Sequence, residues 1–572
     1  MQRVTRVEKQ KVKPLPQVML IFPSNQLTLN TTETMKKQLL SLLLLMVVAT
    51  MPVGAYDFTV DGLYYNQLTD STVEVVNRSN YFTSYLSGHL VIPEKVTYEG
   101  VDYAVTRIGQ SAFYRCDISS VEIPNTVTSI EGSSFHECRY LTSIEFPSSI
   151  TRICSAFHDC VSLTSIHIPA SVVYLEQNTF SLCPGLTSIT VDEENPVYDS
   201  RENCNAIIET ATNMLISGCQ NTVIPSSVTS LGMWAFGGCT SLTSIDLPPA
   251  LRKIPNYAFY QCTGLTSIDI PDTVTEIGYD AFRGCTGLTT IDLPASLGII
   301  EHGAFSENPN LISLEIPSNV YYIYTGVLLM SGASLTSLKV ASDNQYYDSR
   351  EDCNAIIRTS TNELIAGCQN TVLPTTVTSI AESAFSGCVG LTSFEIPGTI
   401  TNIGGGAFLR CTNLERVTIP NTITTIPRLA FAHCEKLNSV TIPESVVSFG
   451  SEPFAYCYAL SRVISKPLVP PTNETQHAFY SSNANAVLFV PNESLDAYRA
   501  DNVWGKFKRI VPFIGAGPGD VNGDGNVSIG DVTNLIDMLI NGDAPAYYDV
   551  NGDGQVSIAD ITALIDQLLG AN

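Results

Sequence analysis

Positive charge is scarce in this chain of 572 residues. It holds 30 Lys plus Arg against 55 Asp plus Glu, a formal net charge of −25 at pH 7. Nucleic acids and anionic lipid surfaces are bound by clustered basic side chains, so this balance argues against both classes of partner. Only 15% of the residues are charged, yet 44% are hydrophobic, which argues against wholesale disorder. The 16 Cys are too few for a disulfide-dense scaffold.

Long apolar runs are also scarce. Residues 39–48 form an apolar run after Lys36 and Lys37, but it is shorter than the roughly 20 residues of a membrane span. Small residues at 53–55 follow it, as a signal-peptidase site requires. We therefore interpret 35–55 as a cleaved signal peptide and 1–34 as an upstream extension, with translation starting at Met1 or Met35. We expect a secreted, extracellular or cell-surface protein without a membrane span.

The sequence lacks the common catalytic signatures. It has no Gly-x-Ser-x-Gly elbow, no His-Glu-x-x-His zinc site and no phosphate-binding Gly loop, and the Gly-rich segment 515–518 is interpreted as a linker. Repeats and their caps account for nearly all of residues 56–514. We therefore predict that the protein is not an enzyme.

An internal repeat fills most of the chain. From Pro124 onward, an apolar residue followed by Pro recurs at steps of 22 or 23 residues within each uninterrupted run. Each unit carries Leu-x-x-Ile-x-Ile, as at Leu265, Ile268 and Ile270, which is typical of a leucine-rich repeat with one short strand. Such units bury their apolar faces only against neighbours. The sequence predicts an α/β repeat solenoid with a parallel β-sheet on one face.

Two rows of repeated side chains are predicted to lie in the core. A Cys three residues before the repeat Leu is replaced only by Asn308 and Gly332, so we interpret the row as buried structural thiols. The Cys row comprises Cys160, Cys183, Cys239, Cys262, Cys285, Cys388, Cys411, Cys434 and Cys457. The Phe row, from Phe113 to Phe431, is interpreted as a core stack and not as a ligand platform.

Two expanded turns, offset by 149 residues, are copies of one another. Residues 206–208 and 214–216 flank Thr-Ala-Thr-Asn, which predicts a β-hairpin. In that hairpin Cys204 faces Cys219, and in the second copy Cys353 faces Cys368. Two alternatives stay open: a cross-strand disulfide in each hairpin, or free buried thiols.

A row of mostly acidic residues is predicted to face solvent between the inward positions of the strands. Either it is a solubilising face, or it is a recognition surface for basic or hydroxyl-rich partners. The candidate ligand face comprises Glu145, Asp246, Asp269, Asp292 and Glu315. A glycosidase pair is disfavoured, because a regular open sheet has no pocket that would raise the pKa of one acid.

The C-terminal segment contains two calcium-binding loops. They start 29 residues apart, place oxygen ligands at loop positions 1, 3, 5 and 12, and carry Gly at position 6. Helical apolar spacing follows each loop. The predicted ligands of two calcium ions are Asp520, Asn522, Asp524, Asn526 and Asp531, then Asp549, Asn551, Asp553, Gln555 and Asp560. The module has nine Asp and no Lys or Arg, so its fold should depend on calcium.

The repeat unit Ile-Gly-x-x-Ala-Phe-x-x-Cys-x-x-Leu-Thr-Ser-Ile-x-Ile-Pro resembles the BspA-type leucine-rich repeats of bacterial surface antigens over 90–465. Residues 56–89 and 466–514 are similar to that family's N- and C-terminal caps. The paired loops and helices of 519–572 resemble a type I dockerin domain, with Asp at position 12. Loop positions 10 and 11 and the acidic Asp537 and Asp566 depart from cellulosomal dockerins, so the resemblance transfers the calcium sites more firmly than a cohesin partner.

Three functional hypotheses follow. The leading one is a non-enzymatic secreted or cell-surface protein, whose solenoid binds a host or bacterial surface protein or a glycan and whose dockerin-like module attaches to a partner such as a cohesin-like domain. The BspA-type resemblance implies adhesion. The alternative is a non-catalytic component of a cohesin–dockerin system for polysaccharide degradation. The third is a purely structural envelope protein.

Overall fold

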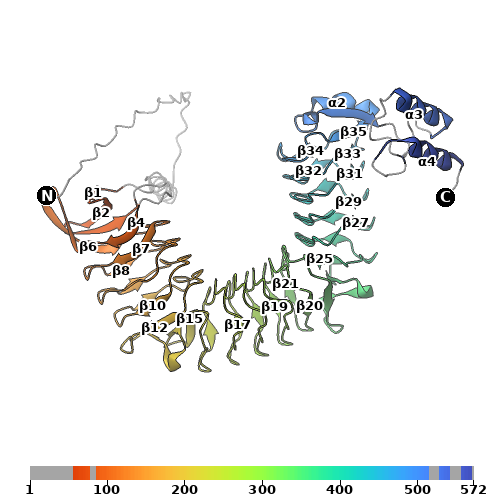
Figure 1. Ribbon diagram of the computed structural model, residues 1–572. Coiled ribbons are helices and arrows are strands. Elements are labelled where there is room, and N and C mark those ends of the chain that lie inside the picture. The colour runs from red at the N-terminus through yellow and green to blue at the C-terminus, as the bar shows by residue number, and fades with distance from the viewer. Residues whose placement is uncertain (1–55, 78–85, 514–526, 542–549, 551–554, 570–572) are drawn as a thin grey trace, which may run out of the picture. The chain divides into compact units, whose positions relative to one another are not determined.

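The computed structural model describes residues 56–77, 86–513, 527–541, 550 and 555–569 (Figure 1). The predicted upstream extension, signal peptide and linker lie outside these residues. The chain divides into two compact units, one of residues 1–251 and 257–264 and the other of residues 252–256 and 265–572. The division falls inside the repeats, so each unit contains its own stack of coils.

A small sheet begins the first unit. Its strands β1 to β3 form an antiparallel meander, and β5 pairs antiparallel with β6. The strands are β1 (Phe58–Val60), β2 (Leu63–Thr69), β3 (Thr72–Val76), β5 (Lys95–Tyr98) and β6 (Val101–Ile108), while β4 (Ser87–Val91) pairs in parallel with β7 (Asp117–Glu122) in a separate sheet. The meander joins the repeats because β6 pairs in parallel with β8, with Ile108 opposite Ile130. Paired strands therefore cover an end of the stack that would otherwise expose an unpaired edge.

Most turns of the solenoid contribute a two-residue strand to a row that we call the first ladder, which is divided among several separate sheets. Its neighbours are parallel and in register, as where Ile153 lies opposite Ile130. The strands are β8 (Ser129–Ile130), β9 (Arg152–Ile153), β11 (Tyr174–Leu175), β16 (Ser230–Leu231), β17 (Lys253–Ile254), β18 (Glu276–Ile277), β19 (Ile299–Ile300), β21 (Tyr322–Ile323), β26 (Ser379–Ile380), β28 (Asn402–Ile403), β30 (Thr425–Ile426), β32 (Ser448–Phe449) and β34 (Thr472–Asn473). The sequence did not predict this ladder, since two residues are too few to show strand alternation.

The predicted Leu-x-x-Ile-x-Ile strands form a second row, which we call the second ladder and which is likewise divided among separate sheets. Its strands are β7 (Asp117–Glu122), β10 (Ser165–Ile168), β12 (Ser188–Val191), β20 (Ser313–Ile316), β22 (Ser337–Val340), β27 (Ser393–Glu395), β29 (Arg416–Thr418), β31 (Ser439–Ile442) and β33 (Arg462–Ser465). The parallel pairing is confirmed, for example by Ile166 opposite Ile189. The described turns between β12 and β20 carry no regular strand at this position. The parallel solenoid is therefore confirmed, with strands less uniform than predicted.

Phenylalanine fills the interior of both stacks. In the first unit Phe135 and Phe157 stack with ring centroids 5.1 Å apart, and in the second Phe385 and Phe408 do the same at 5.1 Å. All four side chains are fully buried. The backbone follows this stack, because the Phe135 amide donates to the carbonyl of Ala156 in the next turn at 2.9 Å. The predicted Phe core is confirmed.

Both expanded turns fold as hairpins, as predicted. The first comprises β13 (Tyr198–Asp199), η1 (Arg201–Asn203), β14 (Ala206–Glu209) and β15 (Met214–Gly218), and the second β23 (Tyr347–Asp348), η2 (Arg350–Asp352), β24 (Ala355–Arg358) and β25 (Glu363–Gly367). β14 and β15 are antiparallel, and β15 then pairs in parallel with β16, so the hairpin continues the first ladder. The last residue of β15 is Gly218, and any larger residue is disfavoured there because a Cβ would lie 2.3 Å from the Phe236 ring.

The repeats of the second unit end in a cap of mixed structure. It comprises β35 (Val487–Pro491), η3 (Asn492–Ser494), α2 (Leu495–Ala500), η4 (Trp504–Lys506) and β36 (Arg509–Phe513), with β33, β35 and β36 parallel. Trp504 and Tyr498 are fully buried. Trp504 Nε1 donates to the Pro471 carbonyl at 3.0 Å and the Tyr498 hydroxyl donates to the Pro467 carbonyl at 2.9 Å. These bonds tie the cap to a proline-rich segment.

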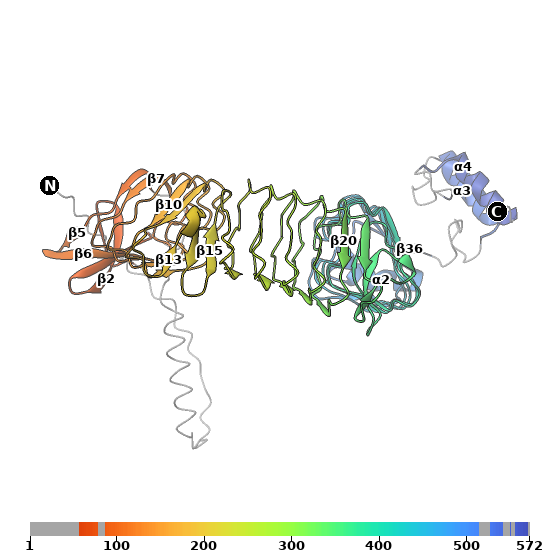
Figure 2. The same cartoon turned by 90° about the horizontal axis from the view of Figure 1, so that it is seen from below.

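Two helices follow, α3 (Ile529–Asn541) and α4 (Ile558–Leu569), and they lie side by side (Figures 1 and 2). Val532, Leu535 and Leu564 are buried between them, as the helical spacing predicted. Ile565, predicted on the same face, is 37% exposed. None of the described helices is long and apolar enough to cross a bilayer.

Candidate functional site

The cysteine row has a structural role. In seven turns the thiol lies 3.1–3.3 Å from the carbonyl oxygen of the Phe one turn earlier, as from Cys160 to Phe135. A thiol is a weak donor, and here it adds a second hydrogen bond to a carbonyl that already accepts a backbone N–H, as the Phe135 carbonyl does from Cys138. Burial raises the pKa of the Cys183 thiol to about 12, so the reactive thiolate is disfavoured. The interpretation as structural thiols is confirmed.

Two polar residues take over this role where the Cys is missing. Asn308 Nδ2 donates to the Phe282 carbonyl at 2.9 Å, and the Ser331 hydroxyl donates to the Phe305 carbonyl at 2.5 Å. The sequence placed Gly332 in this row by its distance from the repeat Leu. The hydrogen bond that Cys makes in other turns is made here by Ser331, one residue before Gly332.

The hairpin cysteines are not paired. All 16 cysteines are free and buried. The Cys219 thiol lies 3.6 Å from the Asn205 carbonyl, whereas the Cys204 thiol lies 3.8 Å from the Ala206 carbonyl. A bulge between Ile207 and Ile208 shifts the strand register by one residue, so the pairing that would align the two cysteines is lost.

The second hairpin repeats this arrangement. The Cys368 thiol lies 3.5 Å from the Asn354 carbonyl and the Cys353 thiol 4.0 Å from the Ala355 carbonyl, with the equivalent bulge between Ile356 and Ile357. Burial raises the pKa of the Cys353 thiol to about 11. Of the two alternatives, the structure has the free thiols in both hairpins.

The predicted ligand face is an open row of acids. All five of its residues, Glu145, Asp246, Asp269, Asp292 and Glu315, are exposed. Asp246, Asp269 and Asp292 lie outside regular strands, while Glu315 lies in β20 opposite Lys339 of β22. No ion pair within the described residues involves any of the five. The row is therefore solvated, and its use as a ligand face stays a prediction.

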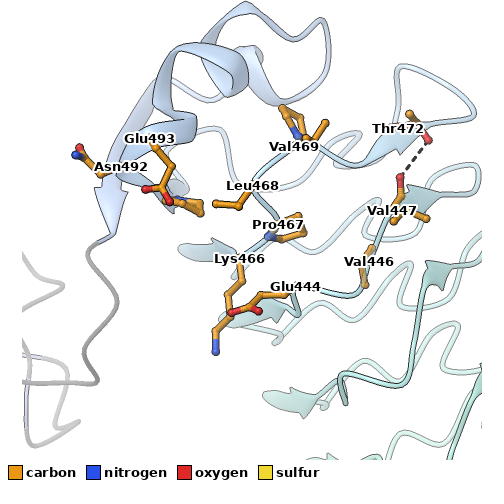
Figure 3. A pocket seen from close by; sticks show the side chains of 12 residues that line it. Glu444, Val446, Val447, Lys466, Pro467, Leu468, Val469, Thr472, Asn492 and Glu493 are labelled. Atoms are coloured by element: carbon orange, nitrogen blue, oxygen red, sulfur yellow. Dashed lines mark hydrogen bonds between the residues drawn. The ribbon is translucent and has the colours of Figure 1, made fainter. Parts of the chain in front are cut away.

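A hollow of about 710 Å³ lies beside the C-terminal cap (Figure 3). It is lined by Glu444, Val446, Val447, Lys466, Pro467, Leu468, Val469, Pro470, Thr472, Pro491, Asn492 and Glu493. Leu468 and Val469 are 60% and 76% exposed, and Figure 3 shows Lys466 beside Glu444 at the rim. The repeat pattern of the sequence did not predict this hollow. The only signal for it was the unusual run of prolines at 467–471, outside the repeat pattern.

The last acidic residue of each predicted calcium loop is fully buried at a helix start. Ser528 donates its backbone N–H to Asp531 Oδ2 at 2.7 Å, and its hydroxyl accepts the Gly530 N–H at 3.1 Å. This reciprocal arrangement is a capping box. Both Asp531 and Asp560 are 0% exposed. The first turn of the helix therefore holds the carboxylate in a defined orientation.

The start of α4, after the second loop, has the same geometry. Ser557 N–H donates to Asp560 Oδ2 at 2.7 Å, and Ala559 N–H donates to the Ser557 hydroxyl at 3.1 Å. Val550 N–H, at loop position 2, donates to the other carboxylate oxygen of Asp560 at 2.7 Å. The carboxylate is thereby oriented toward its own loop as well as toward its helix.

Calcium fits these two carboxylates. A buried carboxylate needs a compensating positive charge, and residues 519–572 contain no Lys or Arg. Gln555, at position 7, is exposed, as expected for a residue that would contribute its backbone carbonyl. Within the described residues no three His, Cys, Asp or Glu side chains form a metal site. Seven predicted ligands lie outside the described residues, namely Asp520, Asn522, Asp524, Asn526, Asp549, Asn551 and Asp553.

The same helices expose two equivalent apolar residues. Ile529 and Ile558, both at loop position 10, are 73% and 76% exposed. Asp537 and Asp566 are also exposed, each eight residues farther along its helix. The two halves of the module therefore present similar surfaces, each with an isoleucine and an aspartate.

Two family profiles match the chain. The BspA type leucine rich repeat region matches in six copies over residues 106–212, 215–332 and 361–486, which is more than half of the chain. The dockerin type I domain matches residues 518–569. No curated protein matches the chain.

Several solved structures of leucine-rich-repeat proteins are similar to it. A leucine rich cell surface protein from Faecalibacterium prausnitzii is 21% identical, covering 84% of this chain and 100% of its own, with a TM-score of 0.38. A leucine-rich repeat protein from Bacteroides ovatus is 21% identical, covering 76% and 100%, with a TM-score of 0.35. The pneumococcal vaccine antigen PcpA is 16% identical, covering 81% and 99%, with a TM-score of 0.40.

The two matched families agree with the geometry described above. Type I dockerin domains bind calcium and a protein partner, and both families consist of non-catalytic domains of extracellular or surface-associated proteins. The chain belongs to the BspA-type leucine-rich-repeat family and carries a type I dockerin domain at its C-terminal end.

Proposed function

We propose that this protein is a non-enzymatic, exported binding protein, which attaches through its dockerin domain and presents its solenoid to a ligand. The observation that carries the proposal is the pair of fully buried aspartates, Asp531 and Asp560, at matching helix starts. They make the dockerin domain a calcium-dependent attachment module, separate in chemistry from the solenoid. The predicted export signal at 35–55 and the two matched families support the extracellular site of action.

Two calcium ions would occupy the dockerin domain. The first would be held by Asp520, Asn522, Asp524, Asn526 and Asp531, and the second by Asp549, Asn551, Asp553, Gln555 and Asp560. In each loop the bound ion would neutralise carboxylates that otherwise repel one another. Metal binding is thereby coupled to folding of the domain.

The attachment partner would be a cohesin-like protein domain with apolar contacts. Ile529 and Ile558 are exposed at equivalent positions, and large exposed apolar side chains on a small module favour a protein interface. Exposed Asp537 and Asp566 add negative charge to the same helices, which favours a partner with basic residues at its rim.

The solenoid would bind a host or bacterial surface protein or a glycan. The candidate ligand face is the exposed row of Glu145, Asp246, Asp269, Asp292 and Glu315. Its carboxylates have no ion-pair partner among the described residues, so they are available to basic or hydroxyl-rich groups of a ligand.

Separate pull-down experiments with the partners of the dockerin domain and of the solenoid test this function. The full-length protein is incubated with immobilised cohesin-like domains and, separately, with surface proteins and glycans, in calcium and in chelator. We expect cohesin binding only with calcium, and its loss in an Ile529→Asp, Ile558→Asp double variant that still binds the solenoid ligand. Solenoid binding that is lost in an Asp269→Asn, Asp292→Asn variant supports the ligand face. Turnover of any bound glycan would contradict the non-enzymatic assignment.

The dockerin match also favours an alternative within the same class. The protein would be a non-catalytic subunit of a cohesin–dockerin system for polysaccharide degradation, with the solenoid as its glycan-binding or scaffold part. Co-purification of glycan-degrading enzymes with the full-length protein, in calcium and not in chelator, would distinguish it from an adhesin.

A further inference from the structure

Five aromatic side chains gather on consecutive turns near the C-terminal cap. They are His433, Tyr456, Tyr458, His477 and Tyr480, and we call them the aromatic cluster. His433 stacks on Tyr456 with ring centroids 4.3 Å apart, and Tyr480 lies edge-on to Tyr456 at 5.6 Å and to His477 at 5.4 Å. Tyr458 and Tyr480 are 54% and 48% exposed. The cluster is therefore a surface feature, unlike the buried Phe stack beneath it.

The backbone disfavours aromatic side chains at two of these positions. His433 and Tyr456 precede the repeat Cys and adopt φ of 58° and 61°. The same position has a positive φ in the other turns as well, where it is either glycine, as at Gly284 with φ of 74°, or another residue, as at Arg410 with φ of 58°. A left-handed conformation costs a residue with a side chain about 1–2 kcal/mol. Because the other turns adopt the same conformation at this position, this cost belongs to the repeat backbone and does not distinguish the aromatic cluster.

A second hollow, of about 290 Å³, adjoins the cluster. Tyr480 and His477 line it together with Phe479, Phe507, Gln476, Asn483 and Lys506, among others. Its volume is at the small end of the roughly 300–1,000 Å³ range of ligand pockets. The hollow therefore suits one ring of a ligand, with the remainder lying across the exposed tyrosines.

Polar groups around the hollow are available to a ligand. Within the described part of the chain no hydrogen bond engages the hydroxyl of Tyr458 or Tyr480, or the side-chain amide of Gln476. Lys506 Nζ donates to the backbone carbonyl of Gln476 at 3.1 Å, which places an ammonium group at the rim of the hollow. The site thus combines aromatic walls with donors and acceptors at the edge.

We propose that the aromatic cluster and its hollow bind a pyranose ring of a glycan. A pyranose has apolar C–H faces and a rim of hydroxyl groups. Its faces match the rings of Tyr458 and Tyr480, and its hydroxyl groups match the amide of Gln476 and the ammonium of Lys506. A purely apolar peptide would use the walls and leave these polar groups unpaired, which is unfavourable. The proposal rests on the proposed function and names the ligand class of the solenoid.

Affinity electrophoresis of the full-length protein tests the site. The probes are soluble glucan, xylan and galactomannan, which are neutral, and polygalacturonate, which is acidic. We expect at least one of them to retard the protein, and Tyr480→Ala and Tyr458→Ala each to weaken that binding about tenfold. Tyr480→Phe keeps the ring and should keep most of the binding. Tyr322→Ala, which removes a 42% exposed tyrosine elsewhere in the same unit, is the matched control and should change nothing.

Three outcomes would overturn the proposal. They are failure of every polysaccharide to bind, binding that Tyr480→Ala leaves intact, and capture of a proline-rich peptide at this site in place of a glycan. Thermal unfolding of each variant confirms that it is folded, which is expected because both tyrosines are exposed. If the solenoid binds a surface protein but no glycan, this proposal fails while the proposed binding function stands.

Discussion

Removal of calcium should unfold the dockerin domain and leave the solenoid intact. Three side chains, Val532, Leu535 and Leu564, form the buried core of the described helices, so hydrophobic burial in the module is small. At roughly 0.05–0.15 kcal/mol per residue, a domain of this length would be stable by about 3–8 kcal/mol. Two calcium sites, each filled at 100 times its dissociation constant, contribute about 5 kcal/mol together. Chelation should therefore remove most of the stability of the domain.

Circular dichroism melts with calcium and with chelator measure this effect. We expect two transitions in calcium, and in chelator an early loss of helical signal while the β signal of the solenoid melts unchanged. Asp560→Asn should lower the first transition by about 10 °C or more, because one site loses its fixed carboxylate. Asp566→Asn removes the same charge from the exposed side of α4 and serves as the control. A dockerin transition that is identical with and without chelator would refute the reasoning.

Three further predictions concern the solenoid. Thiol titration of the unfolded protein without reductant should find all 16 cysteines reactive, whereas the folded protein should react slowly because every thiol is buried. A count of fewer than 16 reactive thiols in the unfolded protein would support the disulfide alternative. Burial lowers the pKa of His158 to about 4, so the folded state favours the neutral ring. The free energy of unfolding should therefore fall as the pH drops from about 6.5 through 4. Urea unfolding of His158→Gln should show a weaker dependence of this free energy on pH. Tyr198→Phe should cost about 1–3 kcal/mol in urea unfolding, because the Tyr198 hydroxyl accepts the buried Leu175 N–H at 2.8 Å; an unchanged midpoint would contradict that role.

Features that recur with the repeat were readable from the sequence. The period of 22 or 23 residues predicted a parallel solenoid, and Phe135 and Cys160 were assigned to the core because their residue types recur in most turns. Prediction succeeds here since each turn contacts mainly its neighbours, so the local pattern already contains the tertiary contacts. Asp531 and Asp560 were predicted as position-12 ligands for a similar reason, because a calcium loop lies within 12 consecutive residues, but their burial is known only from the structure.

The strand register of the hairpins and shifts of one residue in the Cys row could not be predicted from the sequence. The hairpin centre suggested Cys204 opposite Cys219, but a bulge at Ile207 and Ile208 moves the pairing by one residue. Counting from the repeat Leu selected Gly332, whereas Ser331 makes the hydrogen bond to Phe305. In both cases a shift of one residue decides which side chains meet, and this shift depends on the backbone geometry.

The sequence by itself determined the solenoid, its core rows and the two hairpins, because each of these follows from residues close together in the chain, while the calcium loops stay a prediction. The tertiary structure alone decided that most turns carry an additional two-residue strand, that Asp246, Asp269 and Asp292 lie outside regular strands, and that two hollows adjoin the cap. The hollow beside Tyr480 is formed by side chains that the chain brings together from residues 460 to 507. A repeat pattern carries no information about such a place, since the hollow forms where the repeats stop and the cap begins.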